Sequence, residues 1–207
     1  MIKQHLTKVV VIGDSGVGKT SLLKQYMTKT FSPQYKATIG SDFLQKFVVI
    51  DDKKVSLQLW DTAGQEVHMS LGTAFYKGSD CCVIVYDITN PKSFERIAMW
   101  KEEFLNQASP KDAERFPFVL LGNKLDKESE RKISTGKANE WCKLNGTFPF
   151  FEVSAKDNSN VEEAFDKITR CGLEYQTQSV VVPYNTGETK KLHLHNKKPD
   201  HSKKKCC

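Results

Sequence analysis

A glycine-rich segment near the start of the chain has the residue types that bind phosphate. Residues 13–20 read Gly-Asp-Ser-Gly-Val-Gly-Lys-Thr, a glycine, four variable residues and then Gly-Lys-Ser/Thr, directly after a Val/Ile run. Glycines let successive backbone N–H groups turn toward phosphate oxygens beside the positive end of a helix. We expect Lys19 to reach the β- and γ-phosphates and the Thr20 hydroxyl to bind Mg²⁺. The segment predicts a nucleotide site, with an ordinary glycine turn as the alternative.

A second polar segment, Asn-Lys-Leu-Asp at 123–126, directly follows the apolar run 118–121. A carboxylate at Asp126 can accept hydrogen bonds from N1–H and the 2-amino group of guanine. Adenine lacks this donor pair and would leave the buried carboxylate unpaired. We expect the stem of Lys124 to lie over the base and Asn123 to tie this loop to the phosphate loop. The pattern alone is also typical of a solvated loop.

Position distinguishes a base site from a solvated loop. Ser154, Ala155 and Lys156 follow another apolar run that ends at Val153, and a backbone N–H of this segment can meet guanine O6. Open α/β sheets bind ligands beyond the carboxyl ends of their strands. Three loops at such ends predict one guanine-nucleotide site.

The segment Asp-Thr-Ala-Gly-Gln at 61–65 follows the run that ends at Trp60, again at a carboxyl end. Asp61 can hold Mg²⁺ through a water, and Gly64 can offer an N–H to a γ-phosphate. Gln65 can hold an attacking water in line, and since its amide is a poor base its value is orientation. Thr38 is a candidate second hydroxyl on the metal or, equally, an ordinary loop threonine.

Apolar runs that predict strands alternate with helical patterns along the chain. Strands are expected at 8–12, 43–50, 55–60, 81–86, 118–121 and 148–153, and helices at 19–27, 91–107, 134–144 and 160–175. The polar turn Asp51–Lys54 joins the second and third strands as a hairpin. The alternation predicts an α/β fold, a mostly parallel six-stranded sheet with one antiparallel edge strand and helices on both faces.

The 207 residues predict one domain, 1–178, and a flexible basic tail, 179–207. Residues 186–207 hold seven lysines against two acidic residues, which leaves about +1 for the rest of a chain of net charge +6. Nucleic-acid binding is not expected, because the folded part is near neutral and the tail lacks interleaved aromatics. No apolar run exceeds six residues, against about twenty for a membrane helix. No secretory signal is expected from the first eight residues.

The cysteines show neither zinc-type spacing nor a disulfide framework, which predicts a reduced, cytosolic chain. Cys206 and Cys207 end the tail beside its lysines, and two lipid chains, or one plus basic residues, anchor a protein stably to an anionic membrane. We therefore expect lipidation at both. The alternatives are accidental cysteines, a free dithiol, or a weak metal site with the tail histidines.

With these motifs in order, residues 8 to about 175 resemble the Ras-superfamily small GTPases, which have a P-loop NTPase fold. The segments that resemble Rab proteins are Ile39–Phe43, Leu57–Glu66 and Phe75–Ser79. The segments most similar to the late-endosomal Rab seven and Rab nine group are Gln34–Gly40, Asp80–Cys82, Phe104–Pro110 and Phe116–Val119.

The resemblance implies a GDP/GTP switch that cycles between the cytosol and the cytoplasmic face of endosomal or lysosomal vesicle membranes. It implies Mg²⁺ as cofactor, geranylgeranylated terminal cysteines and switch regions near 32–43 and 62–78. Phe31 would pack edge-on against the base, and Phe43, Trp60 and Phe75 would form the aromatic cluster that effectors read. The nucleotide is expected to contact Ser15, Gly16, Val17, Gly18, Lys19, Thr20, Ser21, Phe31, Tyr35, Thr38, Gly64, Asn123, Lys124, Asp126, Ser154, Ala155 and Lys156.

The chain departs from the Rab pattern where Glu-Arg-Phe usually follows the glutamine, since it has Glu-Val-His-Met-Ser at 66–70. Val67 and His68 stand in the segment that exchange factors and activating proteins grip. His68 is a candidate pH sensor or an inert loop residue. The alternative function is therefore a GTP-bound scaffold that barely hydrolyses. A phosphotransferase would need an acceptor site and a lid, and the sequence offers no segment for either.

No arginine finger is evident in the sequence. Intrinsic turnover in such domains is on the order of 10⁻⁴ per second and rises about 10⁵-fold when a partner supplies one. We therefore expect a timer rather than a metabolic catalyst. The resemblance implies a monomer that works with an exchange factor, an activating protein, effectors and a GDP-dissociation inhibitor or escort protein.

Overall fold

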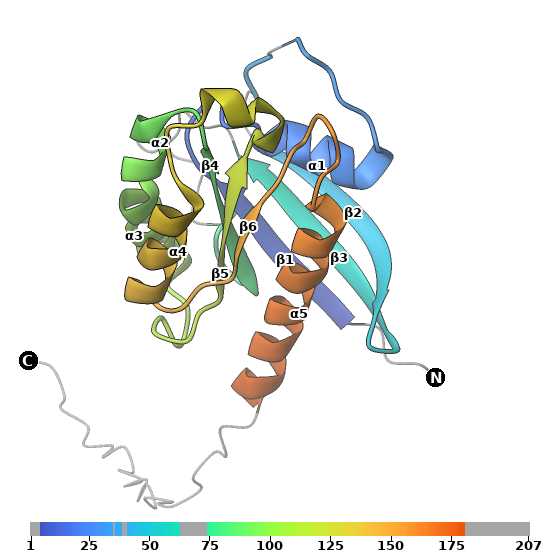
Figure 1. Ribbon diagram of the computed structural model, residues 1–207. Coiled ribbons are helices and arrows are strands. Elements are labelled where there is room, and N and C mark those ends of the chain that lie inside the picture. Colours follow the sequence, from blue (N-terminus) through green and yellow to red (C-terminus); the bar gives the residue numbers. More distant parts are fainter. Residues whose placement is uncertain (1–4, 35, 39–40, 63–73, 181–207) are drawn as a thin grey trace, which may run out of the picture.

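Six strands form one sheet in the computed structural model, which describes residues 5–34, 36–38, 41–62 and 74–180. In chain order the strands are β1 His5–Ile12, β2 Ser41–Ile50, β3 Lys53–Thr62, β4 Cys81–Asp87, β5 Phe118–Asn123 and β6 Phe150–Glu152. Their order across the sheet is β2-β3-β1-β4-β5-β6 (Figure 1). Only the β2–β3 pairing is antiparallel. The predicted sheet, with its one antiparallel edge strand, is confirmed.

Helices cover both faces of the sheet, as predicted (Figure 1). They are α1 Lys19–Thr28, α2 Pro91–Glu95, α3 Ile97–Ala108, the 3-10 helix η2 Leu125–Glu130, α4 Thr135–Leu144 and α5 Val161–Val180. Val9 and Val11 of β1 pack against α1 and α5 on one face. Val10 and Ile12 pack against the cluster of α2, α3 and α4 on the other. Burial on both faces explains why this strand is a continuous apolar run.

The helical pattern over 91–107 is two helices rather than the single one predicted. Asn90 caps α2 by accepting a hydrogen bond from Lys92 N at 3.1 Å. Arg96 then turns the chain with ψ near zero (−1°), which separates α2 from α3. Helix periodicity continues through such a turn because the following residues keep facing the same core.

The β2–β3 turn is shorter than the predicted Asp51–Lys54. Strand β3 already begins at Lys53, so only two residues connect the strands. Asp51 and Asp52 have φ of 49° and 61°, the left-handed pair typical of a type I′ hairpin turn. The prediction was too long because it counted polar residues, whereas Lys53 and Lys54 pair with β2.

Helix α5 continues beyond both its predicted end at 175 and Gln178, to Val180. The division into a domain over 1–178 and a tail over 179–207 stays a prediction. Among the described residues, no helix has the length and apolar character to cross a membrane. The four described cysteines (Cys81, Cys82, Cys142 and Cys171) are buried free thiols, and burial raises the pKa of each.

Candidate nucleotide site

A cavity of about 550 Å³ lies beside the loops that follow β1, β5 and β6. Of the predicted nucleotide contacts, those in its lining are Ser15, Gly16, Gly18, Lys19, Thr20, Ser21, Phe31, Thr38, Asn123, Lys124, Asp126, Ala155 and Lys156. Val17, Asp61 and Ser154 do not line it and are buried behind it. The structure therefore brings together in one place residues that lie up to 141 positions apart in the sequence, from Ser15 to Lys156.

The phosphate loop can pass this close to its neighbours only because it contains glycine. Gly13 and Gly18 have φ of 137° and 98°. A Cβ atom at Gly13 would lie 2.2 Å from the Val85 carbonyl oxygen, and one at Gly18 would lie 2.3 Å from Asn123 Nδ2. Gly18 is also the N-cap of α1 and supplies no capping side chain. The first N–H groups of α1 therefore have no side-chain cap from this residue and suit an anion.

Lys19 and Asp14 are held by different parts of the chain. Lys19 is 5% exposed, and its Nζ donates to the carbonyl oxygens of Gly13 at 2.7 Å and Asp14 at 3.0 Å. The Asp14 carboxylate accepts from Trp100 Nε1 at 2.7 Å and from Arg96 Nη1 at 3.2 Å. The phosphate loop is thereby fastened to the start of α3.

Three oxygen-bearing side chains meet beside the first turn of α1. Thr20 Oγ1 donates to Asp61 Oδ2 at 2.6 Å and lies 2.7 Å from Thr38 Oγ1. Asp61 is 1% exposed, and its second oxygen, Oδ1, is buried without a hydrogen-bond partner. Burial raises the pKa of this carboxyl, while the Thr20 hydrogen bond opposes the rise. Hydroxyl and carboxylate oxygens with one oxygen unpaired fit a hard divalent cation such as Mg²⁺.

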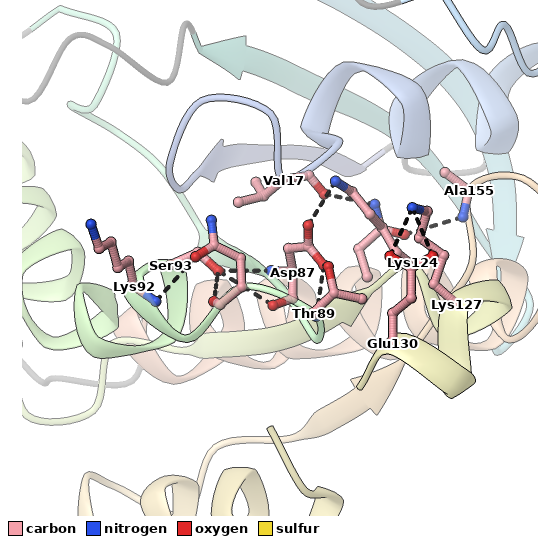
Figure 2. A network of polar contacts seen from close by, with 11 residues as sticks. Val17, Asp87, Thr89, Lys92, Ser93, Lys124, Lys127, Glu130 and Ala155 are labelled. Atoms are coloured by element: carbon pink, nitrogen blue, oxygen red, sulfur yellow. Dashed lines mark hydrogen bonds and ion pairs between the residues drawn. The ribbon is translucent and has the colours of Figure 1, made fainter. Parts of the chain in front are cut away.

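An asparagine links the phosphate loop to the end of β5, beside which the base is predicted to bind. Asn123 Nδ2 donates to the Val17 carbonyl at 2.8 Å, and Asn123 Oδ1 accepts from the Ala155 N–H at 3.2 Å. Figure 2 shows these links between Val17 and Ala155, with Lys124 between them. Lys124 Nζ forms an ion pair with Asp87 Oδ2 at 2.7 Å. The predicted tie between the two loops is confirmed as a contact.

Asp126 is positioned by the loop after β6. Ser154 Oγ donates to Asp126 Oδ1 at 2.7 Å and itself accepts from the Asp157 N–H at 3.0 Å. Lys156 Nζ lies 4.0 Å from Asp126 Oδ2. The Ala155 N–H is engaged by Asn123, so one backbone N–H of the segment 154–156, which is predicted to meet guanine O6, already has an acceptor within the chain.

The three predicted effector-reading aromatics are in contact. Phe43 and Trp60 lie with ring centroids 5.1 Å apart, and Trp60 and Phe75 lie 5.4 Å apart, both edge to face. Lys8 Nζ sits 4.7 Å from the Trp60 ring. Phe43 is 43% exposed, so the cluster reaches the surface.

Comparison with known proteins identifies the family. Residues 8–173 match the Ras family. "Ras-related protein Rab-7a" of Paramecium octaurelia is 52% identical over 99% of this chain and 98% of its own length. "Ypt/Rab-type GTPase ypt7" of Schizosaccharomyces pombe is 57% identical over 83% and 84%. "Ypt/Rab-type GTPase Rab7" of Neurospora crassa is 58% identical over 83% and 84%. The chain belongs to the Ras family as a Rab7-like small GTPase. It hydrolyses GTP and serves vesicle trafficking as a GDP/GTP switch, and this membership does not favour the scaffold alternative.

Several predicted residues of this Rab7-like GTPase lie outside the described residues. They are Tyr35, Gly64, Gln65, Val67, His68, Cys206 and Cys207.

Sequence reasoning missed the residues that bind and position the predicted site residues. Asp87 pairs with Lys124 and accepts from Thr89 Oγ1 at 2.7 Å (Figure 2). One signal was available, because Asp87 is a polar residue that ends an apolar strand and pairs in register with Asn123. Lys127, another lining residue, pairs with Glu130 at the surface. The partners of Asp14 carry no sequence signal, since they lie more than eighty positions away.

Proposed function

We propose that the cavity binds GTP and GDP with Mg²⁺, and that the chain works as a switch on the late endosomal and lysosomal route. One observation supports the binding mode: Lys19, the Thr20–Asp61 pair and Asp126 converge on a single cavity of about 550 Å³ and its wall. The cavity is within the size range of small-molecule sites. Lys19 binds the β- and γ-phosphates, and Asp126 selects guanine.

The metal-binding residues in this proposal are Thr20 and Thr38, with Asp61 acting through a water. When bound at these residues, Mg²⁺ would supply positive charge that stabilises the phosphate groups of the nucleotide. The γ-phosphate orders Thr38 and Gly64, and their release after hydrolysis ends the active state. Gln65 orients the attacking water and stabilises charge, without acting as a strong base.

The partners follow from the same proposal. Family membership implies regulators and effectors in general. We assign the aromatic cluster of Phe43, Trp60 and Phe75 to effector reading, and the segment with Val67 and His68 to exchange factors and activating proteins. A GDP-dissociation inhibitor or escort protein would carry the lipidated tail. No nucleic acid takes part.

Single-turnover hydrolysis tests the catalytic assignment. Purified protein loaded with GTP and Mg²⁺ should turn over on the order of 10⁻⁴ per second. Gln65→Leu should lower that rate further, because the attacking water loses its orienting amide. Equal rates in the two proteins would contradict the role of Gln65. Retained GTP without turnover in either would favour the scaffold and implicate the segment with Val67 and His68.

Membrane attachment is tested separately. Lipidation at Cys206 and Cys207, together with the basic tail, should place the protein on the cytoplasmic face of vesicles. Changing both cysteines to serine should leave it in the cytosol, seen by fractionation of cells. Unchanged vesicle labelling of this variant would exclude the lipid anchor, while a variant with serine at Cys142 should behave as the parent does.

A further inference from the structure

The helix that carries Asp126, η2, is short and buries none of its residues. Helix η2 is a six-residue 3-10 helix in which no residue is buried, and Lys127 inside it has non-helical angles, φ −105° and ψ 39°. Helices of this kind have poor hydrogen-bond geometry and are short for that reason. Its position therefore depends on bonds to its neighbours rather than on packing.

Arg131, the C-cap residue that directly follows η2, makes such bonds with every N–H of its guanidinium. Nε and Nη2 donate to the two carboxylate oxygens of Glu128 at 2.8 and 2.6 Å. Nη1 and Nη2 donate to those of Glu152 at 2.5 and 3.0 Å. The remaining Nη1 donor reaches the Ile133 carbonyl at 2.9 Å. All five donors are thus used, and both carboxylates are gripped through two oxygens.

Burial distinguishes the two ion pairs. The side chains of Arg131 and Glu152 are 16% and 14% exposed, whereas that of Glu128 is 63% exposed. An exposed pair contributes little because water screens it. The Arg131–Glu152 pair is the one that can fix geometry, and Thr135 Oγ1 supports it by donating to Glu152 Oε2 at 3.0 Å.

Glu152 ends β6 and lies two residues before Ser154, whose hydroxyl holds Asp126. The Leu125 N–H donates to the Val153 carbonyl at 3.0 Å and joins the start of η2 to the same strand end. The helix is therefore bound at both ends to the end of β6 and the loop after it, by Leu125 and Asp126 at its start and by Arg131 just after its last residue.

We propose that Arg131 and Glu152 are positioning residues for guanine specificity, which hold η2 so that the Asp126 carboxylate meets both donors of the base. This inference rests on the proposed role of Asp126. A carboxylate that accepts from N1–H and the 2-amino group together must be held within about half an ångström of the right place. In this proposal the 2-amino group meets Asp126 Oδ2, the oxygen that Ser154 does not bind. A shift of η2 therefore weakens that contact first, while the Ser154 hydrogen bond restrains Oδ1.

Binding of GDP and of inosine diphosphate, which lacks only the 2-amino group, measures this alignment. The wild-type protein should prefer GDP, and Asp126→Ala should remove the preference. Arg131→Ala should reduce the preference about tenfold, since small misplacements of a site group have effects of this order or larger. Arg131→Lys and Glu152→Gln should lie between, because each keeps part of the pair, and they serve if Arg131→Ala does not fold.

Arg170→Ala is the matched control. It removes another arginine–carboxylate pair, with Asp51, between α5 and the β2–β3 turn and outside the cavity lining. It should change thermal stability at most, with the GDP preference intact. Equal loss of affinity for both nucleotides in the Arg131 and Glu152 variants, or no loss, would overturn the positioning role while Asp126→Ala still removes the preference. If Asp126→Ala keeps the preference, the proposed base contact is itself wrong, and the role of Arg131 falls with it.

Discussion

The cavity has two ends that are built in different ways: the base end, with Asn123 and Asp126, where guanine is proposed to bind, and the metal end, with Thr20, Thr38 and Asp61. At the base end, Asn123 has a partner on each side of its amide, and Asp126 is held by Ser154. At the metal end, Thr20 and Thr38 contact each other, and Asp61 keeps one buried oxygen without a donor. The first arrangement is complete within the chain, whereas the second suits a cation.

This difference assigns recognition of guanine and the response to the bound nucleotide to different ends of the cavity. Groups already bonded to the chain keep their geometry whichever nucleotide is bound, so the base end can recognise guanine in both states. A buried, unpaired carboxylate oxygen costs free energy unless a cation or donor compensates it. Thr38, in the described stretch 36–38, joins this group, and under the proposed function it reports on the ligand's charge. Under the proposed function, the base end identifies the ligand and the metal end responds to it.

The largest expected effect is the loss of guanine binding when Asp126 at the base end is changed. Asp126→Asn replaces an acceptor by an amide that also donates, so guanine loses two hydrogen bonds to a charged group. We expect GDP affinity to fall on the order of a thousandfold, and xanthosine diphosphate to bind better than GDP. Titration of both nucleotides measures the change. Asp157→Asn is the control, since Asp157 lies in the same loop but contributes only its N–H to Ser154; a similar loss there, or unchanged GDP affinity in Asp126→Asn, would contradict the assignment.

Much of this comparison could be predicted from the sequence. Apolar runs located the strands, and the polar segments after them located Lys19, Asp61 and Asn123 at one edge, because parallel strands end together. The role of Arg131 could not be predicted, since its pairing with Glu152 depends on the path of η2, a helix without apolar periodicity. Local backbone angles decided the break at Arg96, which a periodic pattern does not record.

The second prediction tests the metal end by removing Mg²⁺ with a chelator. A chelator should speed GDP release from the wild-type protein, and Asp61→Asn should weaken Mg²⁺ binding about 10- to 100-fold, as expected for a group that acts on the metal through water. The chelator should then have little further effect on the variant. Release of a fluorescent GDP analogue measures both rates. Thr30→Ala, at another lining residue, should respond to the chelator as the wild type does, and an Asp61→Asn protein that did so too would remove Asp61 from the metal site.

The smallest expected effect concerns the support of the phosphate loop, which lies between the two ends. Trp100→Phe keeps an aromatic side chain but removes the pyrrole part of the indole, whose N–H binds Asp14, and Arg96 remains as the other partner. The loss of a hydrogen bond to a charged group should lower the free energy of unfolding by about 1–2 kcal/mol, partly offset by Arg96. Thermal denaturation measures this, with Trp141→Phe as the control because no nucleotide-site contact involves Trp141.

GDP release and its response to the chelator should change less than about threefold in Trp100→Phe, because the indole N–H binds the Asp14 carboxylate, whereas the Lys19 ammonium binds the carbonyl oxygens of Gly13 and Asp14. A large rise in release would show that the phosphate loop depends on α3 as closely as the base end depends on β6. The phosphate loop and the base end would then each depend on a side chain outside the cavity, Trp100 for the loop and Arg131 for the base end, whereas the metal end would depend on its ligand.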